Sequence, residues 1–284
     1  MRPLLCLGEP AADRHDDGRD LREILRQARQ IVTLDWIFFE GGEPFLYHPL
    51  LLAGVREAAR LRFRVGVVSN AYWATDPDDA VEWLRPFAGL VGDISISSDL
   101  YHGSEKISPR ATNACVAAER LGIPAGIISI AQPDAADASL SFGQLPQGES
   151  AVMGRGRAAE RLAPRVHGWP AARFTECPHE DLRDPDRVHV DPFGNVLVCG
   201  GIRAGNVLET PLPELAARYA PASHPVIGPL LAGGPAELAR RHGIDCGGDY
   251  ADACHLCDHV RRALRGRFPE TLGPDQMYGV VEKS

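Results

Sequence analysis

The sequence predicts an α/β protein with a parallel sheet, followed by a smaller cysteine-rich region. Short apolar runs alternate with helix-length segments through the first half of the chain, which indicates right-handed βαβ units. Five of the seven cysteines follow position 176. A length of 284 residues allows one large domain or two smaller ones. We therefore expect one domain over residues 1–163 and a second over 174–270.

The individual elements follow from apolar spacing and turn residues. Leu21, Ile24 and Leu25 share one face of a helix expected at 20–28. The other expected helices of the first domain are 49–62, 77–87, 108–121 and one from about 158. The expected strands are 36–39, 63–69, 93–98 and 123–130, with 151–153 as a candidate fifth. Further along we expect a loop at 131–150, a hairpin over 188–199, and helices at 212–218, 236–242 and 254–265.

Composition and charge argue against several classes of protein. With 44% hydrophobic and 24% charged residues, the chain can bury a sizeable core. A net charge of −8 argues against a nucleic-acid partner. No apolar stretch is long enough for a membrane span, and the apolar run at the start is too short for a signal-peptide core. We expect a cytoplasmic protein whose cysteines are reduced and available for metals or catalysis.

The tetrapeptide Gly41-Gly42-Glu43-Pro44 is the first candidate site. It follows the apolar run 36–39 and precedes a helix opened by Pro49, so it lies at the carboxyl end of a strand. Two glycines let the backbone approach a ligand closely, and the Glu43 carboxylate can receive an ammonium group. A simple strand-to-helix turn would use the same residues, and the position in the chain is what favours a binding site.

Polar residues that end the other expected strands are further candidates, because ligands of parallel sheets bind at the carboxyl ends of strands. These residues are Ser69, Asn70, Ser97, Ser98, Asp99, Gly154, Arg155, Gly156 and Arg157. Asp99 and the nearby His102 are the candidates for orienting a cofactor or moving a substrate proton, with solvated loop residues as the alternative.

Together these segments resemble the radical S-adenosylmethionine (SAM) superfamily, over about residues 20–260. In that family a strand followed by G-G-E-P binds the methionine amino group of SAM. Residues 67–71 lie where the family often has a strand ending in T-N-G, 94–99 lie where a strand end approaches the ribose, and 153–158 resemble its G-R-A segment. The resemblance implies SAM-binding residues Gly41, Gly42, Glu43, Pro44, Ser69, Asn70, Ser97, Ser98 and Arg155.

The resemblance also implies a partial (βα)6 TIM-like barrel and an enzyme. In relatives a 5′-deoxyadenosyl radical abstracts a hydrogen atom from the substrate, and a ferredoxin or flavodoxin is the kind of electron donor to expect. The cofactors carry the hard chemistry, while the protein positions the reactants and excludes water. Relatives with cysteine-rich extensions often modify ribosomally made peptides, so a peptide or small protein is the expected substrate.

One family feature is missing. The C-x3-C-x2-C motif that holds the SAM-binding [4Fe–4S] cluster is absent, and Cys6 is the only cysteine before Cys115. At the family's spacing, the motif and its strand would lie upstream of Met1. We therefore expect an amino-terminal truncation, a barrel that lacks its first strand, and little packing of residues 1–18. A relative that has discarded the cluster, and acts as a cluster-free binding protein, is the alternative.

The C-terminal cysteines resemble the SPASM or twitch extensions, which carry auxiliary clusters. Cys177 is followed by sixteen residues, Gly194, four residues and Cys199, close to the C-x9–15-G-x4-C opening of those extensions. Cys254 and Cys257 add a C-x2-C pair. The resemblance implies one auxiliary [4Fe–4S] cluster on Cys177, Cys199, Cys254 and Cys257, with Cys246 as a spare or exchange ligand.

Several alternatives stay open for these residues. A four-cysteine zinc site would use the same ligands in a zinc-stabilised α/β protein. A redox pair at Cys254 and Cys257, or unliganded thiols in a core, would also fit the spacing. The basic stretch of Arg261, Arg262, Arg265 and Arg267 reads as an exposed helix face, or as a docking site for an acidic peptide or electron donor.

Two geometric expectations follow. Parallel strands place their carboxyl ends at one face, so the polar residues that follow them should line one cleft. Those residues are Glu43, Ser69, Ser97 and Arg155. The four sulfurs should surround one centre, because the hairpin returns Cys199 toward Cys177 and the C-x2-C pair begins a helix.

Overall fold

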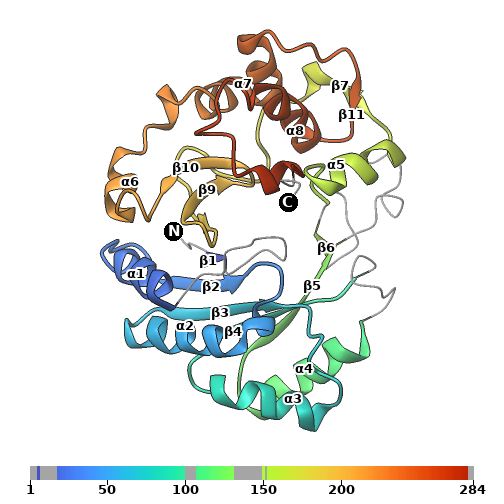
Figure 1. Cartoon of the computed structure of the whole chain (residues 1–284). Coiled ribbons are helices and arrows are strands. Elements are labelled where there is room, and N and C mark those ends of the chain that lie inside the picture. Colours follow the sequence, from blue (N-terminus) through green and yellow to red (C-terminus); the bar gives the residue numbers. More distant parts are fainter. Residues whose placement is uncertain (1–4, 7–17, 100–106, 131–148, 151, 281–284) are drawn as a thin grey trace. The chain divides into compact units, whose positions relative to one another are not determined.

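The computed structural model describes residues 5–6, 18–99, 107–130, 149–150 and 152–280 (Figure 1). The chain divides into two compact units, and each unit is built from separate stretches. The first unit comprises Met1–Ile130, Asp186–Val196 and Asn206–Ala217. The second comprises Ala131–Pro185, Leu197–Gly205 and Arg218–Ser284. The units therefore differ from the two continuous ranges expected from the sequence, because two later stretches return to the first unit.

Within the described residues, the largest sheet has six strands, which follow one another in chain order. They are β1 (Leu5–Cys6), β2 (Trp36–Glu40), β3 (Arg64–Ser69), β4 (Asp93–Ser97), β5 (Ala125–Ile130) and β6 (Glu149–Ser150). Every neighbouring pair from β1 to β5 is parallel. The α/β class with a parallel sheet is thus confirmed, whereas the partial barrel stays a prediction.

The strand β1 corrects one expectation. Leu5 pairs with Phe39 and Cys6 pairs with Glu40, so a strand precedes β2 in the sheet. We expected this first strand to be missing. The apolar run at residues 4–7 is too short to show a strand periodicity, which is why the sequence did not reveal it. The other residues of the 1–18 segment, apart from Gly18, lie outside the described residues.

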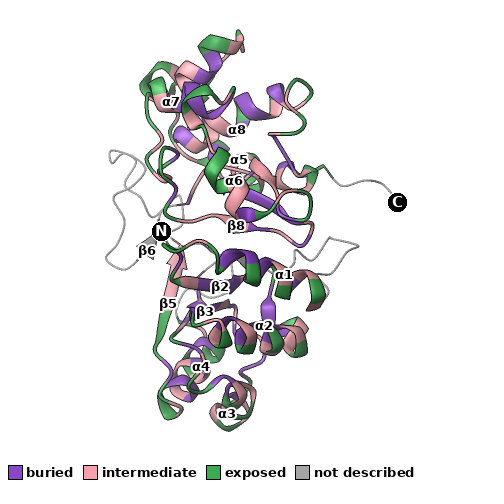
Figure 2. Cartoon of the chain, turned by 90° about the vertical axis from the view of Figure 1, so that its left-hand side faces the viewer, coloured by how far each residue is buried: buried purple, intermediate pink, exposed green. Residues whose placement is uncertain are grey.

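Four helices connect these strands and pack against the sheet. They are α1 (Gly18–Ala28), α2 (His48–Arg60), α3 (Pro77–Leu84) and α4 (Pro109–Arg120). Ile37 and Phe39 are the buried residues of β2, and they alternate with half-buried ones. A β-carbon on Gly54 of α2 would lie 2.8 Å from Phe39 Cε1 and 2.9 Å from Leu21 Cδ2. The helices α1 and α2 therefore lie close against β2, and their buried sides are visible in Figure 2.

The returning stretches complete the first unit. Val190, Val196, Val207 and Leu212 belong to the same hydrophobic core as the sheet. The buried side chain of Gln27 donates to Val207 O over 3.4 Å and accepts from Leu212 N over 2.8 Å, so α1 is tied to the second returning stretch. This long-range packing explains why the first unit is discontinuous in sequence.

The later elements agree with most of the sequence expectations. The hairpin is present, and Asp191 closes its turn by accepting from Phe193 N at 2.9 Å. Its strands β8 (His189–Val190) and β9 (Asn195–Cys199) form a three-stranded sheet with β10 (Ile202–Asn206). The strands β7 (Trp169–Pro170) and β11 (Asp249–Tyr250) form an antiparallel pair. The helices are α5 (Arg157–Arg161), α6 (Leu212–Arg218), α7 (Ile227–His242) and α8 (Ala253–Leu264).

Helix α7 consists of two helical segments joined by a kink at Gly233 and Gly234, and the second segment agrees with the helix expected at 236–242. Gly234 has φ of 64°, and a β-carbon there would collide with the backbone of Thr175 and Glu176. Gly234 and Pro235 hid the first half of the helix from sequence analysis, since both residues normally end helices. Within the described ranges, no helix is both long and apolar enough to cross a bilayer.

Gly66 generates a test of sheet packing. A β-carbon on this residue of β3 would collide with the ring of Phe38 on β2, which stacks on Trp36 with ring centroids 5.3 Å apart. We predict that Gly66→Ala lowers the free energy of unfolding by about 1–3 kcal/mol, because the ring must leave this position. Gly126→Ala on β5 is the matched control, since nothing lies within 4 Å of its β-carbon. Equal urea midpoints for the two variants would contradict this packing.

Candidate binding edge and cysteine cluster

The turn after β2 presents exposed backbone. Gly41 has φ of 132°, a conformation that favours glycine. Gly41 and Gly42 are exposed, whereas Glu43 and Pro44 are buried. A ligand at this edge of the sheet therefore meets the backbone of the two glycines before it meets the Glu43 side chain.

The carboxylate of Glu43 accepts three hydrogen bonds from neighbouring groups of the first unit. Its Oε1 accepts hydrogen bonds from Phe45 N at 3.1 Å and Ser69 Oγ at 2.9 Å, and its Oε2 accepts from Asn70 N at 2.8 Å. A carboxylate offers about four acceptor positions, so these three bonds use most of its capacity. The residue is 6% exposed. Glu43 thus ties the end of β2 to the end of β3, which fits a structural role better than direct capture of an ammonium group.

The residues after β3 form a rigid polar turn around Ser69. Its Oγ accepts from Ala71 N and from Trp73 Nε1, each at 3.0 Å. Ala71 adopts a left-handed conformation with φ of 56°, which is unusual for a residue with a side chain. Burial, and secondarily the charge of Glu43, raises the pKa of Tyr72. The buried hydrogen bonds of Ser69 fix this turn in a single arrangement.

The end of β4 lies at the same edge of the sheet. Ser69 pairs with Ile96, so Ser97, the last residue of β4, lies level with the end of β3. Ser98 Oγ accepts from Ser108 N at 2.9 Å, and buried Asp99 accepts from Ile130 N at 3.0 Å. These two side chains therefore connect the end of β4 with the start of α4 and with the end of β5. His102, the other candidate for proton transfer, lies outside the described residues.

Sequence reasoning missed a carboxylate–imidazole pair in the first unit. Glu40 Oε1, at the end of β2, lies 2.8 Å from His189 Nδ1 of β8. Both side chains are partly exposed, at 21% and 28%. Such a pair can accept or deliver a proton. No motif links the two positions in the sequence, because the return of the hairpin to the first unit is what joins them.

Four cysteines of the second unit form what we call the cysteine cluster: Cys177, Cys199, Cys254 and Cys257. Cys177 lies in the loop between β7 and β8, Cys199 ends β9, and the other two begin α8. Asp252 caps α8 by accepting from His255 N at 2.6 Å, and it also accepts from Gly154 N at 2.8 Å. The cap therefore connects the start of α8 with the segment before α5.

The thiols of the cysteine cluster influence one another. Burial raises the pKa of Cys257 to about 12, opposed by Arg261 and reinforced by Cys199 and Cys177. Burial also raises the pKa of Cys254, with smaller contributions that include Cys257 and Cys199. The pKa of Cys177 is raised by burial and, to a lesser extent, by Cys199. Each sulfur is therefore within electrostatic range of at least one other.

All four thiols are free of disulfides. Over the described part of the chain, no three or more His, Cys, Asp or Glu side chains are grouped so that they could hold a metal ion. The thiolates of an iron–sulfur cluster stand further apart than those on a single ion, because iron and sulfide lie between them. The expected metal ligands therefore stay a prediction, and the donor type fits an iron–sulfur cluster.

The remaining cysteines are placed differently. The sulfur of Cys246 lies 3.7 Å from Ile244 O, and its pKa is raised by burial and by Asp245, with none of the cysteine cluster contributing. Cys115 packs against the hydrophobic core from α4 of the first unit, where burial raises its pKa. Among the contacts of the described residues, none joins Cys246 or Cys115 to the cysteine cluster.

Two arginines approach the cysteine cluster. Arg155, which the family resemblance assigned to SAM, donates from Nη1 to Cys199 Sγ over 3.4 Å. Arg261 is 2% exposed, which corrects its assignment to an exposed basic helix face. Its position four residues after Cys257 was the available signal, because residues at this spacing are neighbours on a helix.

A pocket of about 440 Å³ lies in the second unit beside Cys177. Its lining comes from the loop at residues 175–183, together with Leu230 and Leu231 of α7. The loop contributes both acidic and basic side chains, including Glu180 and Arg183. The pocket gives one member of the cysteine cluster an adjoining cavity.

The Glu43 network makes a stability prediction. Glu43→Gln turns an amide NH2 group toward a backbone N–H, either of Asn70 or of Phe45, so one buried donor loses its acceptor. We predict a loss of about 1–3 kcal/mol in the free energy of unfolding. Glu82→Gln, which removes an exposed pair with Arg85, should change it by less than about 0.5 kcal/mol. Urea unfolding measures both variants, and similar small effects would mean that Glu43 does not brace the edge.

No family model matches the chain, and no curated protein matches it. Among solved structures, the chain is similar to BtrN, described as the crystal structure in complex with AdoMet and 2-DOIA. The identity is 11% and the TM-score is 0.41, over 76% of this chain and 82% of that chain.

Proposed function

We propose that this chain is a radical SAM-type protein that binds SAM at the carboxyl edge of β2, β3 and β4. The Glu43 network carries the proposal. It brings the Gly41–Pro44 turn, Ser69 and Asn70 together at one edge of a parallel sheet, where ligands of such sheets bind. These are the residues on which the family resemblance rests, and they belong to segments separated in the sequence.

The residues at this edge have different proposed roles in SAM binding. The exposed backbone of Gly41 and Gly42 receives the ammonium group of the methionine moiety, while Glu43 keeps the turn in place. The Ser97 hydroxyl, at the end of β4, is the polar group available to the ribose. Glu40 and His189 supply a site for a proton in the first unit.

The cysteine cluster is the proposed site of one [4Fe–4S] cluster, which would supply one-electron transfer when bound. Support comes from the donor set, which consists of four mutually influencing thiols with no disulfide among them. Zinc is the second candidate for the same four donors. The two metals differ in colour and stoichiometry, so experiment separates them.

Radical chemistry in the family depends on a further cluster that binds SAM. This sequence lacks the three-cysteine motif, and Cys6 is the only cysteine before Cys115. That observation favours a second candidate function, in which the chain binds SAM without cleaving it. For the enzyme, a peptide or small protein is the proposed substrate and a ferredoxin or flavodoxin the proposed electron donor.

The binding proposal is tested with SAM itself. Equilibrium dialysis should show binding to wild type, and Gly41→Ala should weaken it about tenfold, because the turn cannot keep its φ without strain. Gly89→Ala is the matched control, since Gly89 also has a positive φ, of 75°, and nothing lies within 4 Å of its β-carbon. Equal loss in both variants, or no binding by wild type, would refute the assigned edge. Formation of 5′-deoxyadenosine under dithionite would favour the enzyme, and binding without cleavage the second candidate.

Anaerobic reconstitution tests the cysteine cluster. We predict about four irons per chain, as expected for one [4Fe–4S] cluster. Cys199→Ala or Cys257→Ala should abolish the visible absorption, because each removes a ligand. Cys246→Ala and Cys115→Ala are the controls and should retain it. Zinc as the sole metal after iron-replete anaerobic expression would favour the zinc site, and absence of both metals would refute a metal centre here.

A further inference from the structure

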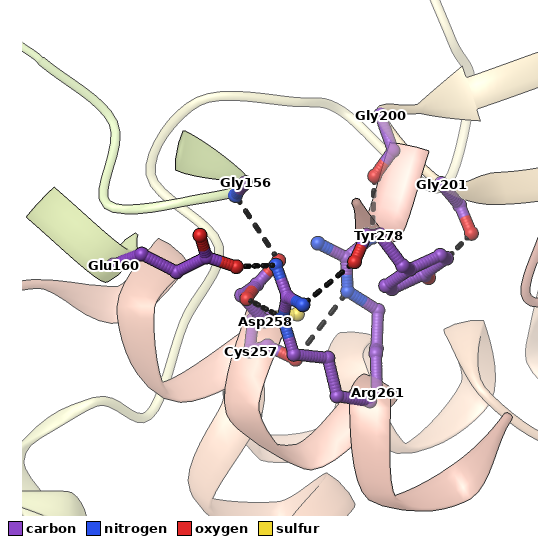
Figure 3. Close-up of polar contacts among 9 residues, drawn as sticks. Gly156, Glu160, Gly200, Gly201, Cys257, Asp258, Arg261 and Tyr278 are labelled. Carbon is purple, nitrogen blue, oxygen red and sulfur yellow. Dashed lines mark hydrogen bonds and ion pairs between the residues drawn. The ribbon is translucent and has the colours of Figure 1, made fainter. Parts of the chain in front are cut away.

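Arg261 is a buried cation, and no carboxylate among the described residues forms an ion pair with it. Its Nη1 donates to Gly200 O at 2.6 Å, and its Nε donates to Cys257 O at 3.3 Å (Figure 3). Both acceptors are uncharged. The guanidinium also lies 5.8 Å from the centre of the Tyr278 ring, whose electrons attract a cation only modestly. Burying a charge is costly unless an opposite charge compensates it, so this position calls for an anion.

The carboxylate of Asp258, which acts electrostatically on Arg261, is already engaged by other groups. Asp258 Oδ2 lies 2.5 Å from Arg262 Nε, and Asp258 Oδ1 accepts from Gly156 N at 3.3 Å. The remaining acidic groups around Arg261 are the thiols of Cys257 and Cys199, together with the Tyr278 hydroxyl. The thiols of the cysteine cluster, once deprotonated, are therefore the groups that can supply the missing negative charge.

Arg155 places a second positive charge beside the cysteine cluster, at Cys199. Its guanidinium donates to Cys199 Sγ and lies over the backbone of Gly200. A β-carbon on Gly200 would be 3.1 Å from Arg155 Nη1 and 3.2 Å from its Cζ. Glycine at this position therefore lets Arg155 approach the sulfur closely.

The turn after Cys199 is also held from the other side. Arg261 binds the carbonyl of Gly200, and Tyr278 Oη donates to the carbonyl of Gly201 at 2.7 Å. Because Arg261 also binds the carbonyl of Cys257, it connects α8 with the turn between β9 and β10. One side chain thus sets the distance between two members of the cysteine cluster.

We propose that Arg155 and Arg261 are positioning residues of the cysteine cluster, and that their two charges balance its thiolates when metal is bound. This inference rests on the metal centre in the proposed function. The inference predicts two properties of that metal centre. Its reduction potential should depend on both charges, because positive neighbours favour the more negative reduced form. Its retention of metal should depend on the link made by Arg261.

The experiment compares reconstituted wild type with Arg261→Met, Arg261→Lys and Arg155→Gln. We expect Arg261→Met to lose iron at a chelator concentration about 10- to 100-fold lower than wild type. A redox titration should give more negative midpoints for Arg261→Met and Arg155→Gln. Arg261→Lys, which keeps the charge, should restore most of the potential. Arg267→Gln is the control, because Arg267 is exposed on the segment after α8.

Urea unfolding provides a readout that separates charge balance from simple packing. Metal should raise the midpoint of wild type more than that of Arg261→Met, whatever the stability of each metal-free protein. If metal raised the urea midpoint of wild type and of Arg261→Met by the same amount, and the reduction potentials of the variants were unchanged, the inference would be overturned. The metal centre itself would still be supported. If Arg261→Met does not fold, the potentials of Arg155→Gln and Arg261→Lys decide. Failure of wild type to take up any metal would refute the centre itself, and this inference with it.

Discussion

The buried carboxylate of Glu43 is the interaction on which the candidate binding edge depends. Loops that follow parallel strands are otherwise independent of one another, because the sheet fixes only where each loop begins. Glu43 removes that freedom by bonding to the turn after β2 and to the turn after β3. The network rests on an aromatic cluster, in which the rings of Phe45 and Trp73 lie 4.5 Å apart. The hydrogen bonds of Glu43 and the packing of these two rings together make the edge rigid in the absence of a ligand.

The cysteine cluster follows a different principle. Burial raises the pKa of Cys177, Cys254 and Cys257, so these three thiols are neutral near pH 7 in the metal-free protein. Arg261 is buried beside them and keeps its charge at every accessible pH. The second unit therefore holds a positive charge whose balance depends on deprotonation of its neighbours. Metal binding deprotonates the thiols, and the resulting thiolates then balance the positive charge of Arg261.

The elements of the first unit could be predicted because their signals are local. Asp76 caps α3 by accepting from Asp78 N and Asp79 N, each at 2.9 Å, and Ser108 caps α4 through Ala111 N at 3.1 Å. Such caps, together with apolar spacing, mark helix starts within a few residues. The order of the strands followed from the same pattern. The candidate residues at the strand ends were named for the same reason, since parallel strands share one edge.

What could not be predicted depends on contacts between distant segments. The return of Asp186–Val196 to the first unit creates the Glu40–His189 pair, and neither residue carries a local sign of it. The role of Glu43 as a brace is also invisible in the sequence, where its tetrapeptide reads as a ligand-binding turn. For Arg261, neighbouring arginines on the helix suggested an exposed basic face. Only the packing of α8 shows that one of them points inward.

The choice of arginine at position 261 follows from this packing. A lysine buried here would lose its proton readily, since burial lowers the pKa of an ammonium group by several units in the absence of an anion. A guanidinium stays charged and offers donors along a rigid plane, so it can reach two carbonyl groups at once. Arg261 uses this geometry to reach the carbonyl of Cys257 on its own helix and that of Gly200 beside Cys199. The same side chain that positions the ligands therefore keeps its positive charge next to them even in the metal-free protein, where a buried lysine would lose its proton.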